Sequence, residues 1–208
     1  MFVENTQTSF PVRAVVVMGV SGCGKTAVGS RLARRMGGAP FIDADDLHSP
    51  QNVDKMARGL ALLDSDRWPW LERVRERISA EAAKLLEGQH ASQKTPQPRY
   101  VVCACSSLKR SYREFLSRSS DPRLPAEQWS HDTVFVYVSV DRQELARRLG
   151  QRKNHFFDPS LLDSQLATLE APDIAREAAV TVDGNAPLAE VVASAYAQIE
   201  GLTLLNSQ

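Results

Sequence analysis

The chain has 208 residues, of which 43% are hydrophobic and 24% charged, a composition that suits one globular domain with a buried core. Its 25 basic residues balance 25 acidic ones, which argues against nucleic acid or an anionic membrane as a general partner. The sequence has no apolar stretch near the roughly 20 residues that a membrane span requires, so we expect no membrane protein.

The first predicted elements are a strand, a glycine-rich loop and a helix. Residues 1–11 lack a basic segment followed by an apolar core, so we expect a flexible tail and no secretory signal. The apolar run 14–18 predicts a buried strand, and apolar residues at positions 28, 32 and 36 predict a helix. Between them, residues 19–26 read G-V-S-G-C-G-K-T and fit the phosphate-loop pattern G-x-x-x-x-G-K-[ST].

This loop predicts binding of a nucleoside triphosphate. Its backbone N–H groups can point into one concavity, and the N-terminus of the helix adds partial positive charge. The side chain of Lys25 can reach the β- and γ-phosphates, and the hydroxyl of Thr26 can bind Mg²⁺. A glycine-rich turn that binds nothing is the alternative, and Lys and Thr in register argue against it. The predicted ATP-binding residues are Gly19, Val20, Ser21, Gly22, Cys23, Gly24, Lys25 and Thr26.

A group of carboxylates follows the second predicted strand, residues 40–43. Ligands of α/β proteins bind at the carboxyl ends of the strands, so Asp43, Asp45 and Asp46 should lie near the phosphate loop. One carboxylate can face the metal and another the substrate hydroxyl, and phosphoryl transfer to an alcohol needs both. In the alternative interpretation these residues are solvated or cap the next helix.

A long amphipathic helix is predicted over residues 71–85, where apolar side chains recur at helical spacing. Just before it, Asp66 can serve as the N-cap, with Pro69 in the first turn. On this segment alone, Arg67 and the two neighbouring tryptophans favour a structural role, as an ion pair and as packed core.

The third predicted strand, residues 100–105, lies between two polar insertions at 88–99 and 119–130. Two of the three cysteines fall in this strand, which favours reduced thiols and a cytoplasmic protein over a disulfide framework. Small hydroxyl-bearing residues and then Lys109, Arg110 and Arg113 follow, and they point to an anion at this edge of the sheet. A solvated, basic helix start is the alternative.

The last third of the chain predicts a strand at 133–139, a short helix capped by Asp141, a strand at 178–182 and a helix over 188–199. Five cations fall within the nine residues that begin at Arg147. We interpret residues 147–158 as a small lid that closes over phosphates, with Arg148 and Arg152 on one face of a continuing helix. RNA binding is the competing use of these cations, and His155 can equally be a packing residue.

Strands that alternate with helices in this way predict βαβ units. The fold class is therefore α/β, a single domain over residues 1–208 with a five-stranded parallel sheet between two layers of helices.

These motifs together resemble the gluconokinases of the shikimate-kinase-like type, within the nucleoside-monophosphate-kinase superfamily of P-loop kinases. The phosphate loop is common to many kinases, whereas three other signatures are much narrower. They are D-A-D-D-L-H at 43–48, D-R-W-P-W-L at 66–71 and L-L-D-S-Q-L-A-T-L-E at 161–170. The similar stretches extend from residue 18 to about residue 170.

The resemblance implies transfer of the γ-phosphoryl group of ATP to the 6-hydroxyl of D-gluconate, with Mg²⁺, by a cytoplasmic enzyme that forms a homodimer. It places Asp43 and Thr26 at the metal, with Lys25, Asp45, Arg148 and Arg152 as catalytic residues. The loop 183–187 would flank adenine. The residues implied to bind gluconate are Asp45, His48, Arg67, Lys109, His155 and Gln165.

Two alternatives stay open at this point. The first is a kinase for another small hydroxy acid or polyol such as shikimate, although shikimate kinases carry G-G-G where this chain has Ser106-Ser107-Leu108. The second is a nucleotide-dependent switch or RNA-binding module, for which a hydroxyl-facing carboxylate would have no use. The chain also departs from the family at Cys23, usually serine, and Ser107, usually alanine. The place of Cys23 beside Lys25 and backbone N–H groups predicts a reactive thiol.

Overall fold

The computed structural model describes residues 12–87, 99–117, 133–151 and 159–205. Several predictions fall outside these ranges: the tail 1–11, most of the insertion 88–99, the insertion 119–130, and Arg152 and His155 of the proposed lid. Within the described part, no helix is long and apolar enough to cross a membrane.

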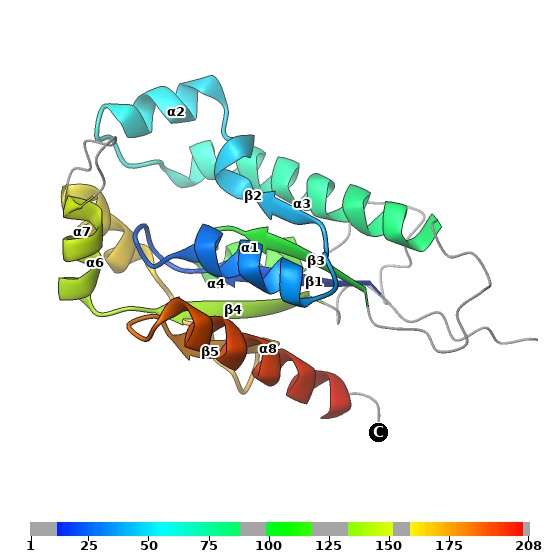
Figure 1. Ribbon diagram of the computed structural model, residues 1–208. Helices are drawn as coiled ribbons and strands as arrows, with labels where there is room; N and C mark the ends of the chain where they lie inside the picture. Colours follow the sequence, from blue (N-terminus) through cyan, green and yellow to red (C-terminus); the bar gives the residue numbers. More distant parts are fainter. Residues whose placement is uncertain (1–11, 88–98, 118–132, 152–158, 206–208) are drawn as a thin grey trace, which may run out of the picture.

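Five parallel strands form one sheet in the order β2-β3-β1-β4-β5 (Figure 1). Each predicted strand is confirmed, with ends that differ by at most two residues. Because all strands are parallel, their carboxyl ends meet at one edge, as the sequence analysis assumed. The strands are β1 Val12–Met18, β2 Phe41–Asp43, β3 Arg99–Ala104, β4 Thr133–Ser139 and β5 Ala179–Asp183.

Helices cover both faces of the sheet, which gives the three predicted layers (Figure 1). The α1 and α8 helices pack on one face, and α3 packs with α4 on the other. The helices are α1 Lys25–Arg35, α2 Pro50–Ala57, α3 Asp64–Glu87, α4 Arg110–Leu116, α6 Arg142–Gly150, α7 Pro159–Thr168 and α8 Leu188–Leu205, with a short 3₁₀ helix, η1, at Ala44–Leu47.

The central strand β1 explains why the core divides into two halves. Val15 and Val17 pack with α1 and α8, whereas Val16 and Met18 pack with α3. Successive side chains of a strand point to opposite faces, and both faces of this sheet are covered. An unbroken apolar run, without alternation, is therefore what this central position requires.

Helix α3 begins earlier than predicted. Asp66 is its third residue and not its N-cap, and Pro69 lies inside the helix. The Asp66 carboxylate accepts a hydrogen bond from the N–H of Leu63 (2.9 Å), so it caps the helix by reaching back from the first turn. The predicted buried face is confirmed at Leu71, Val74 and at every later predicted position up to residue 82.

Three short helical segments were not predicted. Helix α2 starts with Ser49, whose hydroxyl accepts from the N–H of Asn52 (3.2 Å), and with Pro50 at its first turn. This serine–proline pair is a helix-start signal that the sequence analysis missed. The other two segments, η1 and α7, carry too little periodicity over their length to be found in this way.

Candidate active site

The phosphate loop joins β1 to α1 and takes its shape from glycines in the left-handed region. Gly22 and Gly24 have φ angles of 87° and 99°, and Gly24 lies at the N-cap of α1. At Gly19, with a φ of 141°, a Cβ atom would lie 2.8 Å from the Sγ of Cys23 and 3.0 Å from a carbonyl oxygen of β4. The positive φ angles favour glycine at all three positions, and at Gly19 a side chain would also clash.

Lys25 lies at the start of α1, and its ammonium group donates a hydrogen bond to the carbonyl of Val20 (3.2 Å). The Lys25 side chain therefore folds back onto the phosphate loop itself. Cys23, in contrast, is buried at 2% exposure and packs in the core. This burial argues against the predicted reactive thiol, because a reactive cysteine needs access to solvent.

Thr26 and Asp43 come together from neighbouring elements. The Thr26 hydroxyl donates to Oδ2 of Asp43 (2.7 Å), and Oδ1 of Asp43 accepts from the N–H of Asp45 (3.1 Å). A hydroxyl and one carboxylate suit Mg²⁺, which commonly takes its other ligands from water and substrate phosphates. Among the described residues no cluster of three or more His, Cys, Asp or Glu could hold a metal.

The second carboxylate of the motif, Asp45, lies in η1 and is exposed. Its backbone is fixed by Asp43, so the two carboxylates leave the strand end from a rigid turn. One of them is engaged with Thr26, while the other faces solvent, which matches the predicted division between metal and acceptor. The roles themselves stay predictions.

His48 follows η1 and is held by its neighbours. Its ring stacks on Trp70 at a centroid distance of 4.3 Å, and its Nδ1 lies 3.4 Å from the amide nitrogen of Asn52. The amide donates, so Nδ1 accepts and the ring proton lies on Nε2. Burial lowers the pKa of His48, against an opposing effect of Asp45, which favours a neutral imidazole at neutral pH.

The two tryptophans differ in environment. Trp70 is buried and donates from Nε1 to the carbonyl of Ala44 (2.7 Å), which confirms its predicted place in the core and ties α3 to η1. Trp68 is 38% exposed and packs edge-on against Tyr112 and Phe115.

Arg67, between these tryptophans, does not form the predicted ion pair with any described residue. Its Nε donates to the carbonyl of Leu62 (3.2 Å), and its guanidinium carbon lies 6.0 Å from the centre of the Tyr112 ring. The nearby Asp66 carboxylate instead pairs with Lys55 (2.6 Å). The charge of Arg67 is therefore not matched by a contacting carboxylate in the described structure.

Lys109, at the N-cap of α4, forms an ion pair with Asp64. Its ammonium lies 2.8 and 2.7 Å from the two carboxylate oxygens, and the Tyr112 hydroxyl donates to the same carboxylate (2.6 Å). These hydrogen bonds, first from Lys109 and then from Tyr112, lower the pKa of Asp64. Burial and the contact with Asp64 raise the pKa of Tyr112. We call Asp64, Lys109 and Tyr112 the acceptor-side cluster.

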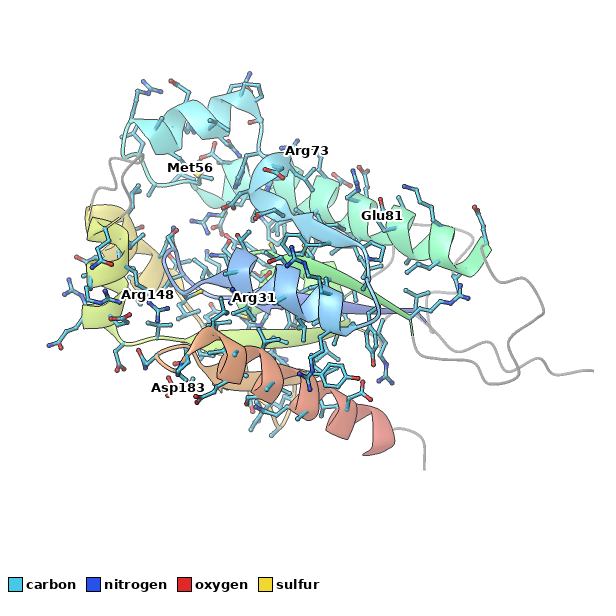
Figure 2. All side chains as sticks on the ribbon, in the orientation of Figure 1. Arg31, Met56, Arg73, Glu81, Arg148 and Asp183 are labelled. Atoms are coloured by element: carbon cyan, nitrogen blue, oxygen red, sulfur yellow. The ribbon has the colours of Figure 1, made fainter. Side chains whose placement is uncertain are left out.

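Arg148 lies on α6 and holds two loops together. Its Nη2 donates to the carbonyl of Gly184 (2.8 Å) and its Nη1 to that of Cys23 (3.4 Å), while its Nε pairs with Glu144 (2.7 Å). Figure 2 shows Arg148 and Asp183, the residue before Gly184, on the same side of the molecule. The loop 183–187 is thus linked to the phosphate loop through Arg148, and its contact with adenine stays a prediction.

The helix that carries Arg148, α6, ends at Gly150. Gln151 is the C-cap of this helix. Arg152 lies outside the described residues, so its predicted place on the same face as Arg148 stays a prediction.

Gln165, expected on the substrate side, contacts the phosphate loop. Its Oε1 accepts from the N–H of Ser21 (2.7 Å), and its Nε2 donates to the Ser21 hydroxyl (3.0 Å). Figure 1 shows why this is possible, since α7 and the β1–α1 loop lie at the same end of the sheet.

Comparison with known proteins places this site in a family. A model described as an AAA domain matches residues 15–172. A probable gluconokinase of Xenopus tropicalis is 40% identical over 196 residues, which span 92% of this chain and 95% of that protein. A gluconokinase of Gluconobacter oxydans is 44% identical over 81% of this chain and 82% of its own length. The chain belongs to the gluconokinase family.

Solved structures agree with this assignment. The crystal structure of a gluconokinase from Sinorhizobium meliloti 1021 has a TM-score of 0.72 and 39% identity, and covers 93% of this chain and 94% of that one. A thymidylate kinase from Candida albicans has a TM-score of 0.62 at 14% identity, with 94% of each chain covered, and shares the fold alone. The predicted P-loop kinase fold and the predicted family are both confirmed.

One residue of the predicted basic anion site has a structural role in this member of the gluconokinase family. Arg113 is buried at 1% exposure, forms two hydrogen bonds with Glu177 (2.6 and 2.9 Å), and donates to the carbonyls of Ser107 (3.2 Å) and Glu170 (2.8 Å). It holds the turn after β3, where Ser107 has a φ of 44°. Arg113 is therefore not free to bind a substrate anion.

Sequence reasoning missed Asp64 and Asn52. Asn52 is buried and bridges His48 to the carbonyl of Asp66 (3.0 Å), and Asp64 organises the acceptor-side cluster. Asp64 stands just before the D-R-W-P-W-L signature, which was the available signal. Nothing local distinguishes Asn52 from other polar residues of a helix.

Proposed function

We propose that this chain transfers the γ-phosphoryl group of ATP to the 6-hydroxyl of D-gluconate, giving 6-phospho-D-gluconate. The observation that carries the proposal is the arrangement at the end of β2, where Asp43 contacts Thr26 of the phosphate loop and fixes the exposed Asp45 beside it. A metal-facing carboxylate and a hydroxyl-facing carboxylate on one rigid turn are what phosphoryl transfer to an alcohol needs.

On the ATP side, the loop N–H groups and Lys25 bind the phosphates and stabilise charge on the transferred group. Thr26 and Asp43 would hold Mg²⁺, which supplies neutralisation of phosphate charge when bound. Asp45 accepts the proton of the attacking hydroxyl, because it is the exposed member of the pair. Arg148 supports the loop from α6 through the carbonyl of Cys23.

On the acceptor side, we assign the gluconate carboxylate to Arg67. The charge of Lys109 is already matched by Asp64, whereas Arg67 contacts no carboxylate among the described residues. The acceptor-side cluster then contacts sugar hydroxyls, with Asp64 as acceptor and Lys109 as donor. His48, neutral and oriented by Asn52, completes this side as a hydrogen-bond donor through Nε2.

An ADP-release assay across gluconate, shikimate, glucose and RNA tests the proposal. We expect ADP release that depends on Mg²⁺ and gluconate, with one phosphate ester formed at the terminal hydroxyl, as judged by phosphorus NMR of the product. Stimulation by shikimate alone would favour the neighbouring hydroxy-acid kinases. Stimulation by RNA alone would favour the switch or RNA-binding alternative.

We further propose that the chain is one domain over residues 1–208, acts in the cytoplasm and forms a homodimer. All three cysteines are free and buried, and burial raises the pKa of Cys105 to about 11, which suits an enzyme of a reducing compartment. The dimer is supported by the family resemblance. Light scattering of the purified protein should give a molar mass of twice the 23.0 kDa of one chain. The mass of a single chain would contradict the homodimer.

A further inference from the structure

The amide of Gln165 makes a two-point contact with the tip of the phosphate loop. Its carbonyl oxygen accepts from the backbone N–H of Ser21 (2.7 Å), and its nitrogen donates to the hydroxyl of the same residue (3.0 Å). The two residues are 144 positions apart, and both are partly buried. One side chain therefore fixes the orientation of a loop peptide and of its hydroxyl together.

Helix α7, which carries Gln165, is itself held on the body of the protein. Leu162 is buried in the core at 4% exposure, and Leu166 packs against the same core. Just after the helix, the N–H of Glu170 donates to the carbonyl of Leu108 (2.8 Å), and the buried Arg113 donates to the carbonyl of Glu170 (2.8 Å). The amide of Gln165 is thus presented from a fixed support.

The loop needs such a support. Gly19, Gly22 and Gly24 give it its shape, and glycine is also the residue that loses most conformational freedom on ordering. A loop that had to order only when phosphates arrive would bind them more weakly. An amide suits the task because it supplies an acceptor and a donor without charge, whereas a carboxylate would repel the phosphates.

We propose that Gln165 is a positioning residue of the phosphate loop, which fixes the Ser21 peptide so that the loop is shaped for ATP before ATP binds. This inference deepens the proposed function and rests on it, and it assigns Gln165 to the ATP side in place of the gluconate side. Gln165 contacts no reacting atom in this scheme. It acts through Ser21.

Kinetics and direct binding of a non-hydrolysable MgATP analogue without gluconate test this assignment. Gln165→Ala should weaken analogue binding and lower kcat/KM for ATP about tenfold, as expected for the loss of two hydrogen bonds. Gln165→Glu keeps the shape of the side chain, and we expect a larger loss that shrinks at high salt. The KM for gluconate should change less than about twofold. Ser164→Ala, at the adjacent position of α7, is the matched control and should behave as wild type.

A double-mutant cycle with Ser21→Ala separates the contact from a general structural effect. Ser21→Ala removes the hydroxyl that Gln165 contacts, so the double variant should lose less analogue affinity than the product of the single losses. Melting temperatures of all variants show whether folding is unchanged. Ser21→Ala keeps the backbone N–H that Gln165 accepts from, so fully multiplicative losses would assign the positioning role to that contact alone. Analogue binding by Gln165→Ala equal to that of wild type would overturn the proposal. So would a gluconate KM raised tenfold with unchanged analogue binding, which would return Gln165 to the substrate side.

The outcome for Gln165 can be told apart from the outcome for the proposed function. If the wild-type protein fails to phosphorylate gluconate, the proposed function fails, yet analogue binding still reports on the phosphate loop. If gluconate is phosphorylated and the Gln165 variants bind the analogue like wild type, only the positioning role fails.

Discussion

The ATP side and the acceptor side of the site are constructed differently. On the ATP side, the glycine-rich loop is mainly backbone, and the side chains of Arg148 and Gln165 form hydrogen bonds with its backbone groups. On the acceptor side, charged side chains face one another, with Asp64 between Lys109 and Tyr112. The first arrangement is suited to phosphate groups, and a phosphate loop of this kind is common to many kinases. The second can recognise an individual pattern of hydroxyls and charge, so substrate choice should depend on it.

This contrast predicts that substitutions on the two sides separate kinetically. Changes on the ATP side should act on nucleotide binding and phosphoryl transfer for any acceptor. Changes on the acceptor side should leave nucleotide binding intact.

The largest expected effect is that of Asp45→Asn. Loss of the proton acceptor should lower kcat with gluconate by roughly 10²- to 10⁴-fold, while the affinity for an MgATP analogue stays nearly unchanged. Steady-state kinetics with calorimetry of analogue binding measures both. Asp46→Asn, the neighbouring exposed carboxylate of η1, is the control and should retain activity. If analogue affinity is lost while turnover is preserved, Asp45 lies at the metal, and the roles proposed for Asp43 and Asp45 are exchanged.

Lys25→Ala tests the ATP side at its centre. Without the ammonium group, charge on the transferred phosphoryl group loses a stabilising partner, so kcat should fall by roughly 10²- to 10³-fold. The KM for gluconate should change little, because the side chain of Lys25 donates to the loop carbonyl of Val20 and, among the described residues, contacts no member of the acceptor-side cluster. Arg31→Ala removes an exposed cation of the same helix and should be silent. Turnover near that of wild type would remove the phosphate-loop assignment.

Asp64→Asn tests the acceptor-side cluster. The neutral amide weakens two charge-assisted contacts to Lys109, so the KM for gluconate should rise about tenfold with the KM for ATP unchanged. Asp54→Asn, which weakens the exposed ion pair between Asp54 of α2 and Arg58 at the C-cap of this helix, is the matched control. A lower KM for gluconate would mean that Asp64 competes with the substrate for Lys109, contrary to the role proposed above.

The smallest expected effect is on stability and concerns His48. Its pKa is lowered from 6.5 in the folded state, mainly by burial, so the unfolded chain binds the proton more readily. Stability should therefore fall as the pH drops below about 6.5, by at most about 1.4 kcal/mol per pH unit for this group.

Melting temperatures between pH 7.5 and 5.5 test this, compared with those of His48→Phe, which keeps a ring against Trp70. The wild-type decline should exceed that of the variant. Equal slopes would mean that His48 does not contribute to the pH dependence.

The amino-acid sequence determined the features that depend on neighbouring residues. The eight residues of the phosphate loop are contiguous, and the apolar runs of the five strands are long enough to be recognised. The parallel arrangement then brought Asp43 and Asp45 to the loop, because the carboxyl ends of such strands share one edge. Trp70 and the buried face of α3 were predictable for the same reason, since their spacing follows the helical repeat.

Only the tertiary structure decided which charged side chains are free and which are already paired. Lys109 and Asp64 are 45 positions apart, and Gln165 and Ser21 are 144 apart, so no local period relates them. The same applies to Arg148 and Arg113, which resemble anion-binding cations in the sequence and prove to be bonded to carbonyls and carboxylates of distant segments. A hydrogen bond between two such side chains depends on how helices and loops pack in three dimensions, and packing is not encoded in the identity of either residue alone.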